Sequence, residues 1–182
     1  MPTILSLCDR TGTWPAPYEE AGYDVIRVEI EDGHDVRLLR VGELPPIHGV
    51  LCAPPCTHFA SSGALHWKRK GDAALLEGLA VVDACLRVVV AVRPAWWCLE
   101  NPVGRLRHYI GAPAMTFQPC DYGDPWTKKT LLWGDFNTDL RRTPVEPEGY
   151  NWTLRFSPGP ERQALRSITP PGFARAFMEA NP

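Results

Sequence analysis

Two apolar segments, each ending beside a chemically reactive side chain, constrain this chain most. The first covers residues 49–53 and stops at two prolines directly before Cys56, and the second covers residues 96–99 and ends at Glu100. Short apolar runs bounded by proline are typical of buried parallel strands. The carboxyl ends of such strands meet at one edge of the sheet, where α/β folds bind ligands. The sequence therefore predicts that a thiol nucleophile and a proton-donating carboxyl group share one site. For Cys56, a buried thiol at a strand end is the alternative interpretation.

The remaining pattern alternates strand and helix candidates and predicts an α/β fold, with a mostly parallel sheet and helices on both faces. Further strands are expected at residues 3–8, 23–29, 115–117 and 130–133. The clearest helix is expected at residues 73–92, because Leu75, Leu79, Val82, Leu86 and Val89 form one apolar stripe. An amphipathic helix is expected at residues 170–180. We expect residues 1–182 to form a single domain in which residues 135–165 are a proline-rich loop.

A polar turn with a glycine follows the first expected strand. The turn contains Asp9, Thr11, Gly12, Thr13 and Trp14, the next strand ends at Glu29, and a further polar turn contains Asp35. Glycine lets the backbone approach a ligand closely, and an acid at the tip of the next strand can accept hydrogen bonds from both ribose hydroxyls. The pattern indicates an adenosine site, with Asp35 placed to meet an adenine amino group. The alternative for Glu29 is an ordinary surface acid.

Composition restricts the class of protein. Hydrophobic residues make up 45% and charged residues 22% of the 182 residues, which is typical of a soluble globular protein. The net charge of −2 gives no overall signal for nucleic acid, although short basic groups occur at residues 68–70, 105–108, 128–129 and 141–142. The six cysteines lack the spacing of a zinc site, and no apolar run is long enough to span a bilayer. We therefore expect a cytoplasmic protein without a metal ion and without a membrane partner.

The order of these motifs resembles that of the DNA cytosine-5 methyltransferases. Residues 53–56 resemble the family's Pro-Cys nucleophile motif, and residues 100–102 resemble its Glu-Asn motif. Residues 5–14 lie where the family has its glycine-rich first motif, although this turn has fewer glycines. Residues 122–130 correspond to the arginine-bearing motif, with lysines in place of the arginines, and residues 167–175 resemble the motif that completes the cofactor pocket.

The resemblance implies a Rossmann-like fold, S-adenosylmethionine as the methyl donor, and transfer of the methyl group to C5 of cytosine in DNA. Cys56 would add to C6 of the ring, Glu100 would protonate N3 or hydrogen-bond to it, and Asn101 would hold that acid in place. The residues expected at the cofactor are Asp9, Thr11, Gly12, Thr13, Trp14, Glu29, Asp35, Pro54 and Thr169. The residues expected at the substrate are Thr57, His58, Lys128 and Lys129.

The short interval between Trp133 and Ser167 leaves no room for a sizeable target recognition domain, as in compact enzymes carried by phages. Such a chain would methylate with little sequence preference, use a separate recognition subunit, or accept single strands; in a duplex the cytosine must be flipped out. Two alternatives stay open: an enzyme that modifies C5 of a free pyrimidine nucleotide, and a catalytically degenerate binding module with a methyltransferase fold.

Overall fold

A six-stranded sheet forms the centre of the molecule. In this computed structural model, which describes residues 1–148 and 159–182, the strands lie in the order β2-β1-β3-β4-β6-β5. Their bounds are β1 Thr3–Leu7, β2 Asp24–Val28, β3 Gly49–Cys52, β4 Trp96–Pro102, β5 Met115–Phe117 and β6 Thr130–Asp135. Strands β1 to β4 pair in parallel, whereas β6 is antiparallel to both of its neighbours, β4 and β5. The sheet is therefore mostly parallel, as expected.

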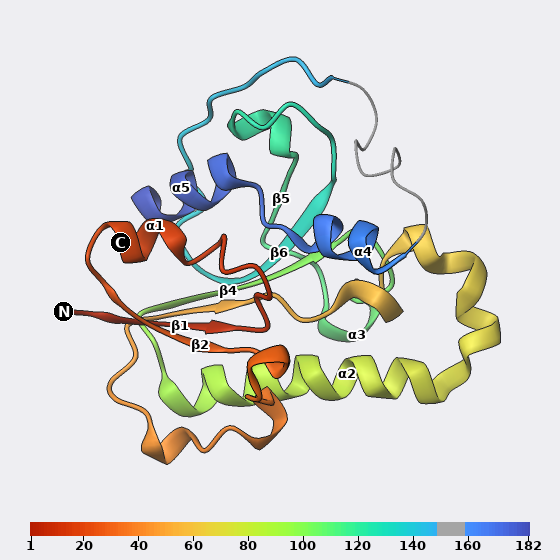
Figure 1. Ribbon diagram of the computed structural model, residues 1–182, viewed down its shortest axis with the longest axis horizontal. Coiled ribbons are helices and arrows are strands. Elements are labelled where there is room, and N and C mark those ends of the chain that lie inside the picture. Colours follow the sequence, from red (N-terminus) through yellow and green to blue (C-terminus); the bar gives the residue numbers. More distant parts are fainter. Residues whose placement is uncertain (149–158) are drawn as a thin grey trace.

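Helices cover both faces of this sheet. Their bounds are α1 Ala16–Glu20, α2 Trp67–Val92, α3 Arg107–Ile110, α4 Pro160–Ser167 and α5 Pro171–Ala180. Helix α2 runs along one face, and α1 and α5 lie on the opposite face (Figure 1). Short 3₁₀ segments occur in the connections: η1 Ile30–Asp32, η2 Val36–Leu38, η3 Val41–Glu43, η4 Cys56–His58, η5 Ser61–His66 and η6 Pro119–Tyr122. The expected α/β architecture is confirmed.

The alternation of side chains along the strands divides the core into two layers. On β1, Leu5 and Leu7 pack toward the α2 side, whereas Ile4 packs on the opposite side, as strand geometry requires. The predicted stripe on α2 is confirmed, because Val82 and Val89 are buried in the first layer. Three further members of the stripe, Leu75, Leu79 and Leu86, are partly buried against the same layer.

Aromatic rings dominate the second layer. Phe173 of α5 stacks on Phe117 of β5, with ring centroids 3.8 Å apart. Phe177, one turn further along α5, meets the ring of Trp96 edge-on at 5.7 Å. Burial of these large rings fixes the C-terminal helix against the sheet.

Three elements differ from the sequence expectation. β4 extends through Pro102, and α2 begins at Trp67 with a non-helical residue, Gly71, inside it. Helix α4 occupies Pro160–Ser167, so the loop expected over residues 135–165 is wrong for its last residues. This helix has no long apolar stripe and follows a proline-rich stretch, so periodicity gave no signal for it. Of that expected loop, residues 136–148 form neither helix nor strand, and residues 149–158 lie outside the described part of the chain.

Candidate active site

The loop that carries Cys56 leaves β3 at the carboxyl edge of the sheet. Pro54 and Pro55 end the strand, because proline cannot donate to a strand ladder and has a fixed φ. Pro55 then caps η4, which begins at Cys56, and the side chain of Cys56 is partly exposed. The two prolines therefore present the thiol on a stiff turn just beyond the strand end.

Asn101 ties this loop to the neighbouring strand. β3 and β4 are parallel neighbours, with Cys52 opposite Leu99, so the residues that follow each position lie at the same edge. The Asn101 side chain is fully buried, and its Nδ2 donates a hydrogen bond of 2.9 Å to the carbonyl oxygen of Pro54. The Glu100 carboxyl group, one residue earlier on β4, is thereby held at the same edge as the thiol loop.

A second set of bonds joins the loop to the segment after β4. The Ser61 amide donates to the Val103 carbonyl at 2.9 Å, and the Arg105 amide donates to the Phe59 carbonyl at 2.9 Å. The backbones approach so closely that a Cβ atom on Gly104 would lie 1.9 Å from the Phe59 carbonyl oxygen. Only glycine fits at this crossing, and the crossing fixes the position of the nucleophile loop relative to β4.

Glu100 lies in an environment that favours its protonated form. Its side chain is 13% exposed, and Lys128 Nζ lies 3.7 Å from its Oε1. Burial raises the pKa of Glu100; Lys128 lowers it, and the negative charge of Asp9 raises it further. A carboxyl group that keeps its proton to higher pH can act as an acid near neutral pH.

The charges around the thiol oppose one another. Burial raises the pKa of Cys56, the positive charges of Lys128 and Arg166 lower it, and the negative charge of Glu100 raises it. Lys128 was expected at the substrate from its motif. Arg166 was not predicted, because it lies on α4, in and beside a stretch that the sequence pattern assigned to a loop.

The polar turn after β1 is folded around Asp9. One carboxylate oxygen, Oδ1, accepts hydrogen bonds from the amides of Thr11 and Gly12, both at 3.2 Å, and Oδ2 accepts from the Trp14 amide at 3.0 Å. Thr11 Oγ1 also bonds to Oδ1 at 3.0 Å and accepts from Thr13 Oγ1 at 2.9 Å. Gly12 has a φ of +65°, which the turn requires. The side chain of Asp9 thus shapes the expected cofactor turn and uses its oxygens within it.

Trp14, which is expected at the cofactor, has its ring in the core. The side chain is fully buried, and it packs against Phe173 and Phe177 of α5 at centroid distances of 6.1 and 5.6 Å. A tryptophan next to a ligand loop and a tryptophan that enters the core look the same in sequence. Here the Trp14 ring packs in the core, because α5 covers this face of the sheet.

Glu29 and Asp35 follow β2, and their carboxylates differ in their capacity to accept hydrogen bonds from a ligand. Glu29 is 9% exposed, and burial raises its pKa. The amide of Glu31, 3.4 Å from Oε1, and the amide of Ile30 donate to its carboxylate, which has further acceptor sites. Asp35 caps η2 and pairs with Arg37 at 2.6 Å, and this arginine lowers the pKa of Asp35. Glu29 therefore keeps capacity to accept hydrogen bonds from a ligand, whereas Asp35 is directed to its own turn.

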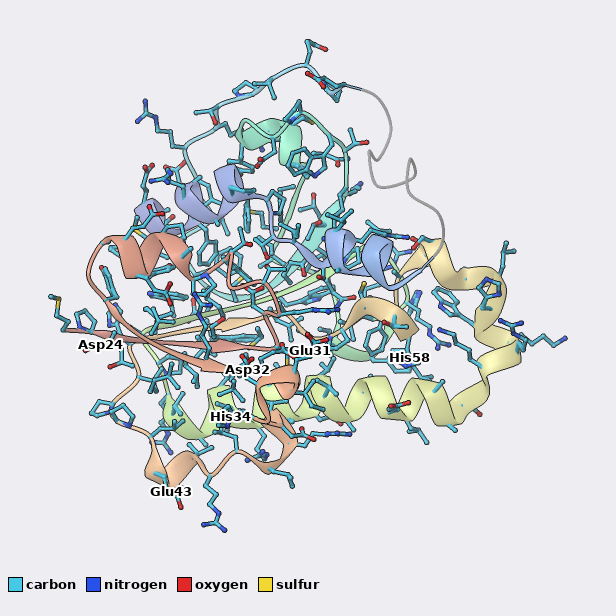
Figure 2. All side chains as sticks on the ribbon, in the orientation of Figure 1. Asp24, Glu31, Asp32, His34, Glu43 and His58 are labelled. Atoms are coloured by element: carbon cyan, nitrogen blue, oxygen red, sulfur yellow. The ribbon has the colours of Figure 1, made fainter. Side chains whose placement is uncertain are left out.

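The other expected substrate residues are spread over the loop and its surroundings. His58 is the last residue of η4 (Figure 2), its Nε2 lies 3.9 Å from Glu77 Oε2 of α2, and burial lowers its pKa. It lines a small pocket with Thr57 on the α2 side of the loop, so His58 faces α2. Thr57 is exposed, and so is Lys129.

Two expected cofactor residues are buried beside the site. Pro54 uses its carbonyl oxygen for the bond from Asn101, and Thr169 is 3% exposed just before α5. Among the described residues, no three histidine, cysteine or acidic side chains gather in a way that could hold a metal ion. In the same part of the chain, every helix is too short or too polar to cross a membrane.

Comparison with known proteins shows that the fold of this chain is similar to that of solved structures. No family model and no curated protein matches this chain. A solved structure of an Entamoeba histolytica methyltransferase aligns with a TM-score of 0.52 at 9% identity, covering 81% of this chain and 58% of that one. A structure described as a DNA modification methyltransferase encoded within an E. coli prophage aligns with a TM-score of 0.47 at 18% identity, covering 81% and 52%. This chain thus spans little more than half the length of either. The fold is a Rossmann-like α/β fold, similar to that of the Entamoeba histolytica methyltransferase.

Proposed function

We propose that this chain transfers a methyl group from S-adenosylmethionine to C5 of cytosine in DNA, through a covalent bond between Cys56 and C6 of the ring. The observation that carries the proposal is that the carboxyl ends of β3 and β4 are joined to each other. The Asn101–Pro54 hydrogen bond holds a thiol and a largely buried carboxyl group at one edge of the sheet. The fold shared with a methyltransferase supports the reaction class.

The residues at this edge fit an adenosyl donor at its ribose end. Glu29 lies at the tip of β2 with acceptor capacity left over, which suits a pair of ribose hydroxyls. The turn from Asp9 to Thr13 would approach the rest of the donor with its backbone, since the Asp9 carboxylate is used within the turn. The donor supplies an electrophilic methyl group carried on sulfur.

The chain's own residues account for the ring chemistry. The Cys56 thiolate attacks C6 and forms an S–C6 bond, while Glu100 donates its proton to N3 and receives the charge that the ring would otherwise carry. C5 becomes enamine-like and would form a bond to the methyl carbon as the methyl–sulfur bond of the donor breaks, which leaves a neutral thioether. A base then removes the C5 proton, the C5–C6 double bond re-forms as the S–C6 bond breaks, and the N3 proton returns to Glu100. The Cys56 thiolate and the Glu100 carboxyl group both end in their starting states, and the C5 proton leaves with the base.

DNA as the substrate is supported by exposed basic residues at the start of α2. Lys68 and Arg69 are exposed, and both follow the nucleophile loop closely. Such residues can contact phosphates without reading sequence. A target cytosine would be single-stranded or flipped out of the duplex at a cost of a few kcal/mol. A separate recognition subunit would supply any sequence preference.

Methyl transfer can be measured with tritium-labelled donor. The protein would be incubated with duplex DNA, single-stranded DNA or dCMP, and the labelled base identified after digestion. We expect label in 5-methylcytosine from DNA, and none with Cys56→Ala. Label in dCMP but not in DNA would instead support the nucleotide enzyme. Absence of donor binding by calorimetry would support a non-catalytic binding module and contradict the proposal.

A further inference from the structure

Arg166, on the last turn of α4, lies within the candidate site although α4 is distant from β3 and β4 in sequence. Its Nη2 donates a hydrogen bond of 2.7 Å to Ser62 Oγ, on η5 of the nucleophile loop. Its backbone carbonyl accepts a bond of 3.0 Å from Lys128 Nζ. Helix α4 is therefore joined at one residue both to the loop that carries the thiol and to the lysine beside Glu100.

Among the residues that the structure describes, the charged groups close enough to act on Cys56 are Lys128, Arg166 and Glu100. Lys128 lies 3.7 Å from Glu100, so its positive charge is balanced only when that carboxyl group is ionised, a state that the burial of Glu100 opposes. Arg166 differs from Lys128, because no carboxylate forms an ion pair with it among the side chains that the structure describes. A guanidinium group also stays protonated at every pH at which a cysteine titrates.

We propose that Arg166 is a positioning residue for the nucleophile: its guanidinium group, fixed by Ser62, adds a positive charge to that of Lys128, and the two together stabilise the Cys56 thiolate. This inference rests on the proposed role of Cys56 as the nucleophile. The site needs such a charge, because burial alone disfavours the thiolate. Only the thiolate attacks an electrophilic carbon, so the docking of α4 on the loop becomes part of thiol activation.

The reactivity of Cys56 toward iodoacetamide tests this without donor or DNA. The rate of alkylation of the Cys56 peptide would be followed by mass spectrometry across a pH series, in the wild-type protein and in Arg166→Gln, Arg166→Lys and Ser62→Ala. Arg40→Gln serves as the matched control, since it removes an exposed arginine directly before η3, where Arg40 pairs with Glu43.

An opposite charge near a titrating group shifts its pKa by about one unit or more. We therefore expect the midpoint of alkylation to rise by roughly one pH unit in Arg166→Gln, which slows alkylation near neutral pH about tenfold. Arg166→Lys should restore most of the rate, Ser62→Ala should shift the midpoint upward by less, and Arg40→Gln should leave it unchanged.

An unchanged midpoint in a folded Arg166→Gln protein, or a shift in Arg166→Lys as large as in Arg166→Gln, would overturn the inference. If Arg166→Gln fails to fold, Ser62→Ala decides, because Ser62 is exposed and its replacement keeps the charge; an unmoved midpoint there also overturns it. If the shifts occur but no variant methylates any cytosine substrate, the role of Arg166 stands and the proposed function fails.

Discussion

Replacing Asn101 should change the position of the nucleophile loop, and hence the activity, much more than the stability of the fold. In Asn101→Ala, the Pro54 carbonyl loses its 2.9 Å donor, and an unpaired buried carbonyl costs about 1–3 kcal/mol. The same change removes Asn101 Oδ1, which is buried without a hydrogen-bond partner and so carries a similar cost in the wild type. The two effects largely offset each other, so we expect a net loss of only about 1 kcal/mol.

The effect on activity should be much larger. The lost bond joins the nucleophile loop to the strand that carries Glu100, and a displacement of about 1 Å at a reacting group can lower the rate about 100-fold. Asn101→Asp should be less stable than Asn101→Ala, because it would place a carboxylate against the Pro54 carbonyl with no donor between them. An uncompensated buried charge of this kind costs about 3–5 kcal/mol.

Urea unfolding followed by tryptophan fluorescence would give the free energies of unfolding, and tritium transfer would give the rates. Asn137→Ala is the matched control, because Asn137 Nδ2 also donates to a backbone carbonyl, that of Ala180 at 3.2 Å. Asn137 follows β6 at the opposite end of the sheet from the thiol loop. It should lose stability without losing rate. Wild-type turnover in Asn101→Ala, or equal stability of the Ala and Asp variants, would refute the reasoning.

Three further substitutions test the acid, the crossing and the ribose site. Glu100→Gln should lower turnover about 10²–10⁴-fold. Burial raises the folded-state pKa of Glu100, so the stability that this group contributes is present at low pH and is lost as the pH rises through that pKa. Between pH 5 and pH 8, Glu100→Gln should therefore lose less stability than the wild type. An equal loss for the two proteins in urea unfolding would contradict this. Gly104→Ala should cost about 1–3 kcal/mol and slow methylation, because its Cβ would lie 1.9 Å from the Phe59 carbonyl oxygen, whereas Gly63→Ala, with a nearest atom at 3.9 Å, should do neither. Glu29→Gln should weaken donor binding about 10–100-fold by calorimetry, since charged hydrogen bonds contribute about 1.5–3 kcal/mol, and an unchanged affinity would remove Glu29 from the ribose site.

The sheet edge could be predicted from sequence because it depends on local signals. Apolar runs that stop at proline placed Cys56 and Glu100 at the ends of two parallel strands, and strand neighbours in an α/β fold then share one edge. The sequence also singled out Asn101 beside the acid. Its specific bond to the Pro54 carbonyl needed the structure, because an amide has several possible partners within reach.

Arg166 and Trp14 could not be assigned from sequence for a different reason. Arg166 reaches the nucleophile loop, at Ser62, only because α4 docks there, which is a tertiary contact without a periodic pattern. The Trp14 ring enters the core because α5 folds back over the same face of the sheet. Both positions depend on where a helix that is distant in sequence packs: α4 on the nucleophile loop and α5 on the sheet. Local sequence patterns do not show where such a helix packs.

Trapping with DNA that contains 5-fluorocytosine tests the central claim most directly. Fluorine at C5 cannot leave as the proton does, so a ring that has been attacked at C6 and methylated at C5 stays bonded to the enzyme. In the presence of S-adenosylmethionine, the account predicts a denaturation-resistant protein–DNA complex whose tryptic DNA-bearing peptide contains Cys56, and no complex with Cys56→Ala. A complex of undiminished yield with Cys56→Ala, or methyl transfer to ordinary cytosine without any trapped complex on the fluorinated DNA, would contradict it.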